Sequence, residues 1–171
     1  MWEPLNIRGE FPGENTTVAI LDTGLFFQHE NLQGLKTHSG YDFVSDPINS
    51  GDNDGWDSDP TDPGDKSLSY HGSHVTGIVA AQPIDQSNSI TGLAWGAQIM
   101  PLRVLGVNGG TSYDLIQALR YAAGLSNDSL QQPSKPADII NLSLGGSEFS
   151  VAEQATINEV IQTGAIIVAA T

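Results

Sequence analysis

The sequence has 171 residues, of which 39% are hydrophobic and 15% charged, a length and composition that predict one globular domain. It contains no cysteine, which excludes disulfides, thiolate metal sites and a thiol nucleophile. Six basic against twenty acidic residues give a formal net charge of −14, so we expect neither nucleic acid nor a membrane as a partner, because both attract basic side chains.

Apolar runs and amphipathic segments alternate along the chain. The first run, residues 17–21, ends at Asp22 and turns at Gly24, which is typical of a buried parallel strand. Further elements follow in this order: a helix beginning near His71, a strand within 97–105, a helix over 113–125 capped by Ser112 or Thr111, a strand within 139–144, a helix over 151–163 capped by Ser150 with an inward stripe of Ile157, Val160 and Ile161, and a strand within 165–170. This alternation predicts an α/β fold of three layers, with a mostly parallel central sheet and helices on both faces.

Asp22 and His71 stand where such a fold places a site. Asp22 follows a strand, and the carboxyl ends of strands border the crevice of an open parallel sheet. His71 opens an apolar helix and is followed directly by Gly72. An aspartate that fixes the tautomer of a histidine, and a histidine that takes a hydroxyl proton, are two parts of a relay whose third member is a serine. Asp-Thr-Gly on its own is also typical of a turn in which the aspartate has no catalytic role.

Three phrases resemble, in the same order, those of the subtilisin-like serine proteases, the subtilase family (peptidase S8). They are Val-Ala-Ile-Leu-Asp-Thr-Gly at 18–24, His-Gly-Ser-His-Val-Thr-Gly at 71–77 and Ile-Asn-Leu-Ser-Leu-Gly-Gly at 140–146. The resemblance covers nearly the whole chain. It implies that residues 1–171 are the N-terminal portion of a single subtilisin-like catalytic domain, a serine endopeptidase that is secreted and acts on peptides or proteins.

The resemblance also implies roles for individual residues. Asp22 and His71 would be catalytic, and His74 structural. Ser143, Leu144 and Gly145 would form one wall of the specificity pocket. Gly109, Gly110 and Thr111 would form the opposing edge. A peptide held between two such edges by main-chain hydrogen bonds keeps few side-chain requirements, so we expect broad specificity.

Two parts of the family pattern are not found in these 171 residues. One is the Gly-Asn pair whose asparagine lines the oxyanion hole, and the other is the Gly-Thr-Ser-Met-Ala segment with the nucleophile. We therefore expect the fold to be incomplete at the C-terminus, with the remaining C-terminal part of the catalytic domain as a partner. We also expect these residues alone to be inactive. The alternative is a non-catalytic, calcium-stabilised pseudoprotease or binding module.

Eight of the twenty acidic residues fall between Asp42 and Asp65. Carboxylates this crowded do not all remain ionised without a cation. Calcium fits, because it takes about six to eight oxygen ligands in flexible geometry, although no glutamate closes an EF-hand loop here. Some secreted subtilases carry a similar calcium loop between their aspartate and histidine motifs. The predicted ligands are Asp52, Asp54, Asp57 and Asp59; the alternative is a solvated acidic loop.

Two other hydrolase classes share parts of the pattern. Aspartic proteases also carry Asp-Thr-Gly, but their folds are nearly all β and need a second such aspartate. His71 and His74 lie one helical turn apart, as zinc ligands can. Zinc hydrolases, however, usually space the histidines four residues apart with a glutamate beside the first, where Gly72 stands here. We therefore prefer the serine protease.

Overall fold

One parallel sheet forms the centre of the computed structural model, which describes residues 11–64, 69–84, 90–146 and 150–170. Five of its six strands follow the spatial order β2-β4-β1-β5-β6, and the sixth, β3, pairs with β4 outside this order. Every pairing between them is parallel. The strands are β1 (Thr17–Asp22), β2 (Lys36–Thr37), β3 (Tyr41–Asp42), β4 (Gln98–Arg103), β5 (Ile139–Leu142) and β6 (Ile166–Ala169).

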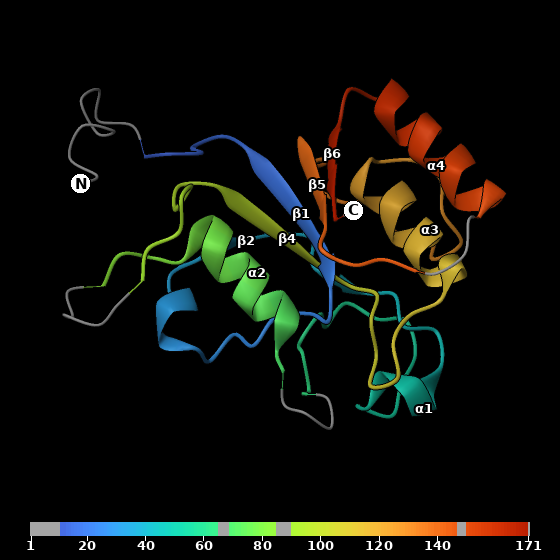
Figure 1. Cartoon of the computed structure of the whole chain (residues 1–171), viewed down its shortest axis with the longest axis horizontal. Helices are drawn as coiled ribbons and strands as arrows, with labels where there is room; N and C mark the ends of the chain where they lie inside the picture. The colour runs from blue at the N-terminus through green and yellow to red at the C-terminus, as the bar shows by residue number, and fades with distance from the viewer. Residues whose placement is uncertain (1–10, 65–68, 85–89, 147–149, 171) are drawn as a thin grey trace.

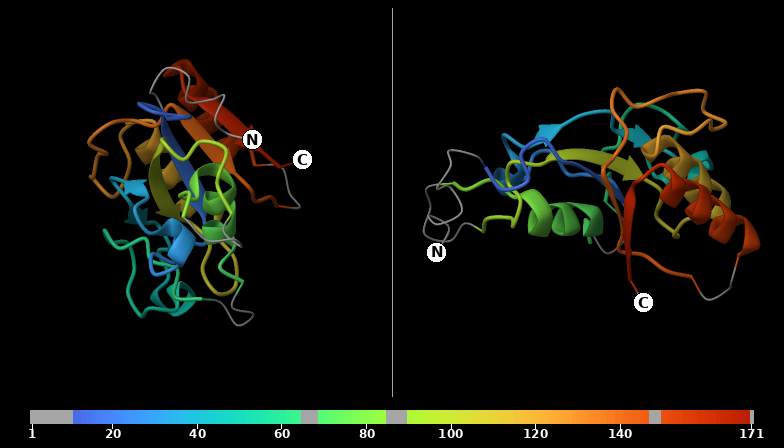
Figure 2. Two further views of the ribbon diagram at one scale, coloured as in Figure 1. Left: turned by 90° about the vertical axis from the view of Figure 1, so that its left-hand side faces the viewer. Right: turned by 90° about the horizontal axis from the view of Figure 1, so that it is seen from above.

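Helices cover both faces of this sheet, as predicted. The helices are η2 (Glu30–Leu32, a 3-10 helix), α1 (Pro47–Ser50), α2 (His71–Ala80), α3 (Ser112–Ala122) and α4 (Val151–Gln162). Figure 1 shows α2 packed on β1 and separate from α3 and α4. The latter two lie side by side (Figure 2).

Alternate residues of β1 supply two separate apolar clusters. Ala19 and Leu21 pack in the cluster that includes Leu119 of α3. Val18 and Ile20 pack in the cluster that includes Ala80 of α2. Because successive side chains of a strand point to opposite faces, α2 and the α3–α4 pair cover opposite faces of the sheet. The predicted three-layer α/β fold is therefore confirmed.

The helix starts agree with their predicted caps. The Thr111 side chain accepts a hydrogen bond from the N–H of Asp114, and the Ser150 side chain accepts one from the N–H of Glu153. The inward stripe of α4 was only partly right, because Val160 is buried while Ile161 is half exposed. Consecutive residues are turned about 100° apart around a helix, so Ile161 lies to the side of the face that Val160 buries.

The strand β6 ends the strand order and leaves apolar side chains exposed. Ile166 is 60% exposed and Val168 is 51% exposed. The carboxyl ends of β1, β4 and β5 lie together at one edge of the sheet, because these strands pair in parallel. The loops that follow them therefore meet at that edge.

None of the helices in the described ranges is long and apolar enough to cross a membrane.

Candidate active site

Asp22 is the last residue of β1, and its side chain is buried. The chain turns directly after it, with Gly24 at a φ of +100° that favours glycine. The N–H of Thr23 donates to Asp22 Oδ1 over 2.8 Å. The backbone of the turn thus fixes one oxygen of the Asp22 carboxylate.

His71 is the first residue of α2, and its imidazole meets this carboxylate. The Nδ1 atom lies 2.8 Å from Asp22 Oδ1 and 3.0 Å from Oδ2. The His71 side chain is 45% exposed, whereas that of Asp22 is 1% exposed. A carboxylate only accepts hydrogen bonds, so Nδ1 carries the proton that it donates to Asp22. The Nε2 atom is then the nitrogen with a free lone pair.

The buried position of Asp22 has an electrostatic cost. Burial raises the pKa of this carboxyl above its usual value, and the negative charge of Asp62 adds a smaller increase. The hydrogen bonds from His71 and from the Thr23 N–H act in the opposite direction. The pair with His71 therefore offsets part of the free energy needed to bury the carboxylate.

The first turn of α2 packs directly against the turn after β1. A Cβ atom at Gly72 would lie 2.3 Å from the carbonyl oxygen of Gly24 and 3.1 Å from Asp22 Cβ. The Gly72 N–H donates to Thr23 Oγ1 over 2.9 Å, and the Phe26 N–H donates to Ser73 Oγ over 2.7 Å. The glycine beside His71 thus permits the approach that brings the imidazole to Asp22.

Both predicted substrate-binding segments meet at one cleft, with a volume of about 660 Å³. Gly109, Gly110 and Thr111 line it before α3, and Leu144 and Gly145 line it after β5. Ser143 is not among its lining residues, and its Oγ accepts a hydrogen bond of 2.9 Å from Asn141. Apolar side chains also line it, namely Val104, Leu105, Leu115, Leu142 and Ile157, together with the polar side chains of Ser112, Ser150, Glu153 and Gln154.

The predicted calcium ligands lie in the acidic loop, where they bond to protein partners. Asp52 Oδ2 is 2.6 Å from Arg103 Nη1. Asp57 Oδ1 accepts from the N–H of Asp59 over 2.7 Å. A hydrogen bond with Asp52 raises the pKa of Asp54, and burial and the charges of Asp52 and Asp57 add to that increase. In the described part of the chain, no three or more histidine or carboxylate side chains are arranged so that they could hold a metal ion. The calcium ligands therefore stay a prediction.

Sequence reasoning missed Arg103, which is 1% exposed at the end of β4. Its guanidinium pairs with the buried Asp42 and with Asp52, and it donates to the carbonyl oxygen of Ser50. The available signal was a lone basic residue that ends an apolar run in a chain whose acids cluster elsewhere. Thr23 and Asp62, hydrogen bonded to each other beside the site, were missed as well.

A buried aspartate that is hydrogen bonded to Nδ1 of a histidine can serve as the acid–base pair for a side-chain nucleophile. The chain belongs to the subtilase family, because the sequence profile of that family matches residues 13–171. This membership and the parallel sheet exclude the aspartic protease alternative.

Named relatives agree with this family. The chain is 36% identical to an "Extracellular protease" of Xanthomonas campestris pv. campestris, over 97% of this chain and 31% of the relative. It is 34% identical to an "Extracellular basic protease" of Dichelobacter nodosus, over 94% and 29%. Among solved structures, proteases from Pseudoalteromonas arctica match with a TM-score of 0.83 and 36% identity, over 93% of this chain and 50% of that chain. The chain thus spans about a third of these curated relatives.

Two glycines of α2 should respond oppositely to alanine. We expect Gly72→Ala to destabilise the fold by about 1–3 kcal/mol or more, because its Cβ overlaps backbone that cannot move freely. Gly77→Ala should stabilise by about 0.5–1 kcal/mol, since nothing lies within 4 Å and alanine favours the helix. Urea unfolding measures both. Equal effects of the two substitutions would contradict the close approach at Gly72.

Removing the buried guanidinium should be costly. We expect Arg103→Met to destabilise by about 3–5 kcal/mol, because Asp42 is left buried without its partner. Lys135→Met is the matched control, since the Lys135–Asp138 pair is half exposed and should contribute under about 1 kcal/mol. Both values come from denaturant unfolding at neutral pH. An Arg103→Met variant as stable as the control would show that the buried pair contributes little.

Proposed function

We propose that this chain is the aspartate- and histidine-bearing part of a secreted serine endopeptidase. The observation that carries the proposal is the Asp22–His71 hydrogen bond of 2.8 Å at the carboxyl edge of a parallel sheet. Family membership and relatives named as extracellular proteases support both the reaction and the secretion.

The chemistry follows from the two ring nitrogens of His71. Asp22 keeps the proton on Nδ1, so the Nε2 lone pair is available to accept the proton of a serine hydroxyl as that oxygen attacks a peptide carbonyl. The imidazolium that forms lies against a carboxylate that is 1% exposed, where screening by water is weak. The serine and the oxyanion-hole asparagine would come from a segment outside these 171 residues.

The cleft of about 660 Å³ is the proposed substrate site. Its volume is within the usual range for ligand pockets, roughly 300–1,000 Å³. Gly109, Gly110 and Thr111 would pair with one side of a peptide, and Ser143, Leu144 and Gly145 with the other. Main-chain pairing supports the proposal of broad specificity. The exposed Ile166 and Val168 of β6 would pack against the remaining part of the catalytic domain.

The protease assignment is tested with two proteins, the complete protein that contains this chain and the 171-residue chain alone. We expect the complete protein to cleave a denatured protein substrate and to react with a serine-directed fluorophosphonate, and the 171-residue chain to do neither. Asp22→Asn should lower kcat by about 10⁴-fold, because the amide holds the wrong histidine tautomer.

Glu159→Gln is the control for that substitution, since Glu159 is exposed and pairs only with Arg120 among the ion pairs of the described residues. Its kcat should equal that of the unaltered protein. A complete protein that folds but neither cleaves nor takes the label would favour the alternative, a non-catalytic pseudoprotease or binding module.

We also propose that calcium binds the acidic loop, with Asp52, Asp54, Asp57 and Asp59 as ligands. The raised pKa of Asp54 beside other carboxylates supports this, because a divalent cation would relieve their repulsion. As placed, these side chains do not form a metal site, so binding would require their carboxylates to turn toward a common centre. Calcium would supply structural stabilisation of the loop.

Isothermal titration of the chain with calcium tests this proposal. We expect binding heat that Asp54→Asn largely removes and that Asp138→Asn, a substitution outside the loop, leaves unchanged. Since the pKa of Asp54 is raised, calcium should displace protons, and its affinity should fall as the pH is lowered toward the acid range. Titrations in two buffers of different ionisation enthalpy would reveal those protons. The absence of any binding heat would end the calcium proposal.

A further inference from the structure

Thr23 connects the two halves of the Asp22–His71 pair. Its N–H donates to Asp22 Oδ1 over 2.8 Å. Its Oγ1 accepts from the N–H of Gly72, the residue after His71, over 2.9 Å. One residue therefore holds the carboxylate through its backbone and the start of α2 through its side chain.

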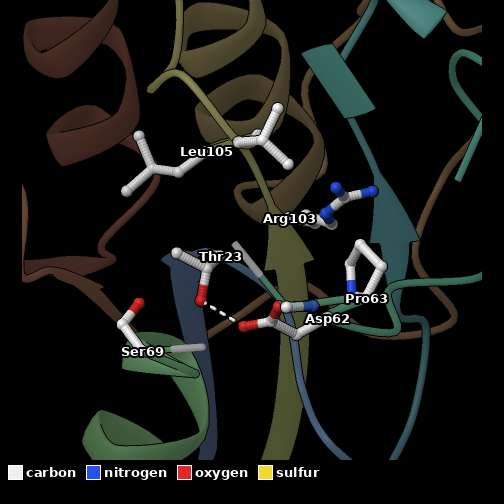
Figure 3. Close-up of a pocket in the computed structure, with 9 residues that line it drawn as sticks. Thr23, Asp62, Pro63, Ser69, Arg103 and Leu105 are labelled. Carbon is white, nitrogen blue, oxygen red and sulfur yellow. Dashed lines mark hydrogen bonds between the residues drawn. The ribbon is translucent and has the colours of Figure 1, made fainter. Parts of the chain in front are cut away.

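The direction of the Thr23 hydroxyl is set by a second carboxylate. Thr23 Oγ1 lies 2.6 Å from Asp62 Oδ2. Figure 3 draws this hydrogen bond as a dashed line between the two side chains. A threonine hydroxyl has one proton to donate, and the Gly72 N–H can only donate. The hydroxyl proton must therefore point to Asp62, which leaves an oxygen lone pair for Gly72. The separation of 2.6 Å is typical of a hydroxyl bonded to a carboxylate.

Asp62 is itself held firmly. It is 4% exposed, and its Oδ1 accepts from the Gly64 N–H over 2.7 Å. Its own N–H donates to the carbonyl oxygen of Leu25 over 3.1 Å, and the Leu25 N–H donates to Pro60 over 2.9 Å. Within the described ranges, no basic side chain forms an ion pair with Asp62. One of its oxygens instead accepts a hydrogen bond from Thr23, in the turn after Asp22, and the other accepts one from Gly64 in its own loop.

We propose that Asp62 and Thr23 are positioning residues for His71. Asp62 orients the Thr23 hydroxyl, and Thr23 ties the first turn of α2 to the turn after β1, so the imidazole stays on Asp22. The proposal deepens the proposed function and rests on it, because it matters for catalysis only if His71 is the base. If Asp62 had only a structural role, it would stabilise the loop between Pro60 and Gly64 and have no effect on the position of His71.

Three substitutions in the 171-residue chain separate these roles. Thr23→Val keeps the shape but removes the hydroxyl, and Thr23→Ser keeps the hydroxyl but removes the methyl group. Asp62→Asn keeps the volume but supplies only one acceptor oxygen, so it cannot serve both Thr23 and Gly64 as before. The readouts are the NMR resonance of the His71 Nδ1 proton and the hydrogen exchange of the Gly72 amide.

We expect the His71 Nδ1 resonance to be lost in Thr23→Val and Asp62→Asn and retained in Thr23→Ser. The Gly72 amide should exchange about tenfold faster in the first two variants, the size expected for losing one hydrogen bond. The amide of Leu102, buried in β4, should keep its exchange rate in all three and so report an intact core.

An unchanged His71 resonance and Gly72 exchange in Thr23→Val and Asp62→Asn would overturn the proposal. Loss of the His71 Nδ1 resonance together with faster exchange of the Gly72 amide in Thr23→Ser would overturn it as well, because serine retains the hydroxyl. If Thr23→Val and Asp62→Asn fail to fold, Thr23→Ser decides by the same two readouts, the His71 Nδ1 resonance and the exchange rate of the Gly72 amide. Neither readout involves peptide hydrolysis, so an inactive complete protein would refute the proposed function and leave the positioning result intact.

Discussion

The close approach of α2 to the turn after β1 is the constraint on which the site depends. Asp22 is fixed by the sheet, since β1 pairs on both sides and the residue ends the strand. His71 reaches it only because the next residue is a glycine, whose missing Cβ leaves room for the Gly24 carbonyl. The hydrogen bond of 2.8 Å then offsets part of the cost of burying the carboxylate. Packing and electrostatics are therefore coupled at this contact, because a small shift of the helix would both open the interface and leave Asp22 without its partner.

Three of the buried aspartates, Asp22, Asp42 and Asp62, are each compensated differently. Asp22 is bonded to a histidine, Asp42 to Arg103, and Asp62 to a hydroxyl and a backbone N–H. Burial raises the pKa of Asp42 to about 7, although its hydrogen bond from Val44 and the Arg103 charge counteract the increase. Loss of Arg103 would be strongly destabilising, because Asp42 would stay buried without a positively charged partner. Arg103 fastens the acidic loop to β4, directly beside the strand that carries Asp22.

The main elements were predictable because each has a local signal. The four long strands are apolar runs, and α3 and α4 begin at Thr111 and Ser150, which cap them as expected. The strands β2 and β3 were missed because two residues show no periodicity. The Asp22–His71 contact could be anticipated from motifs, whereas the Thr23–Asp62 bond could not. Those two residues are 39 positions apart, and only the packing of the intervening loop brings them together.

The sheet topology explains why the Asp22–His71 pair and the loops that line the cleft all lie at the carboxyl edge of the strands. In a parallel sheet each strand must be followed by a crossover, and the chain leaves every strand at the same edge. The end of β1 supplies Asp22 and the turn after it supplies Thr23. The loop from β4 to α3 supplies Gly109 to Thr111, and the segment after β5 supplies Leu144 and Gly145. Each group is thus anchored to a buried strand at one end and to a helix at the other. Such loops vary in sequence without disturbing the core, yet they keep a fixed place relative to one another because β1, β4 and β5 are adjacent in the sheet. Because β1 lies between β4 and β5, its end lies between the starts of the two loops that line the cleft, although neither Asp22 nor His71 is among the lining residues.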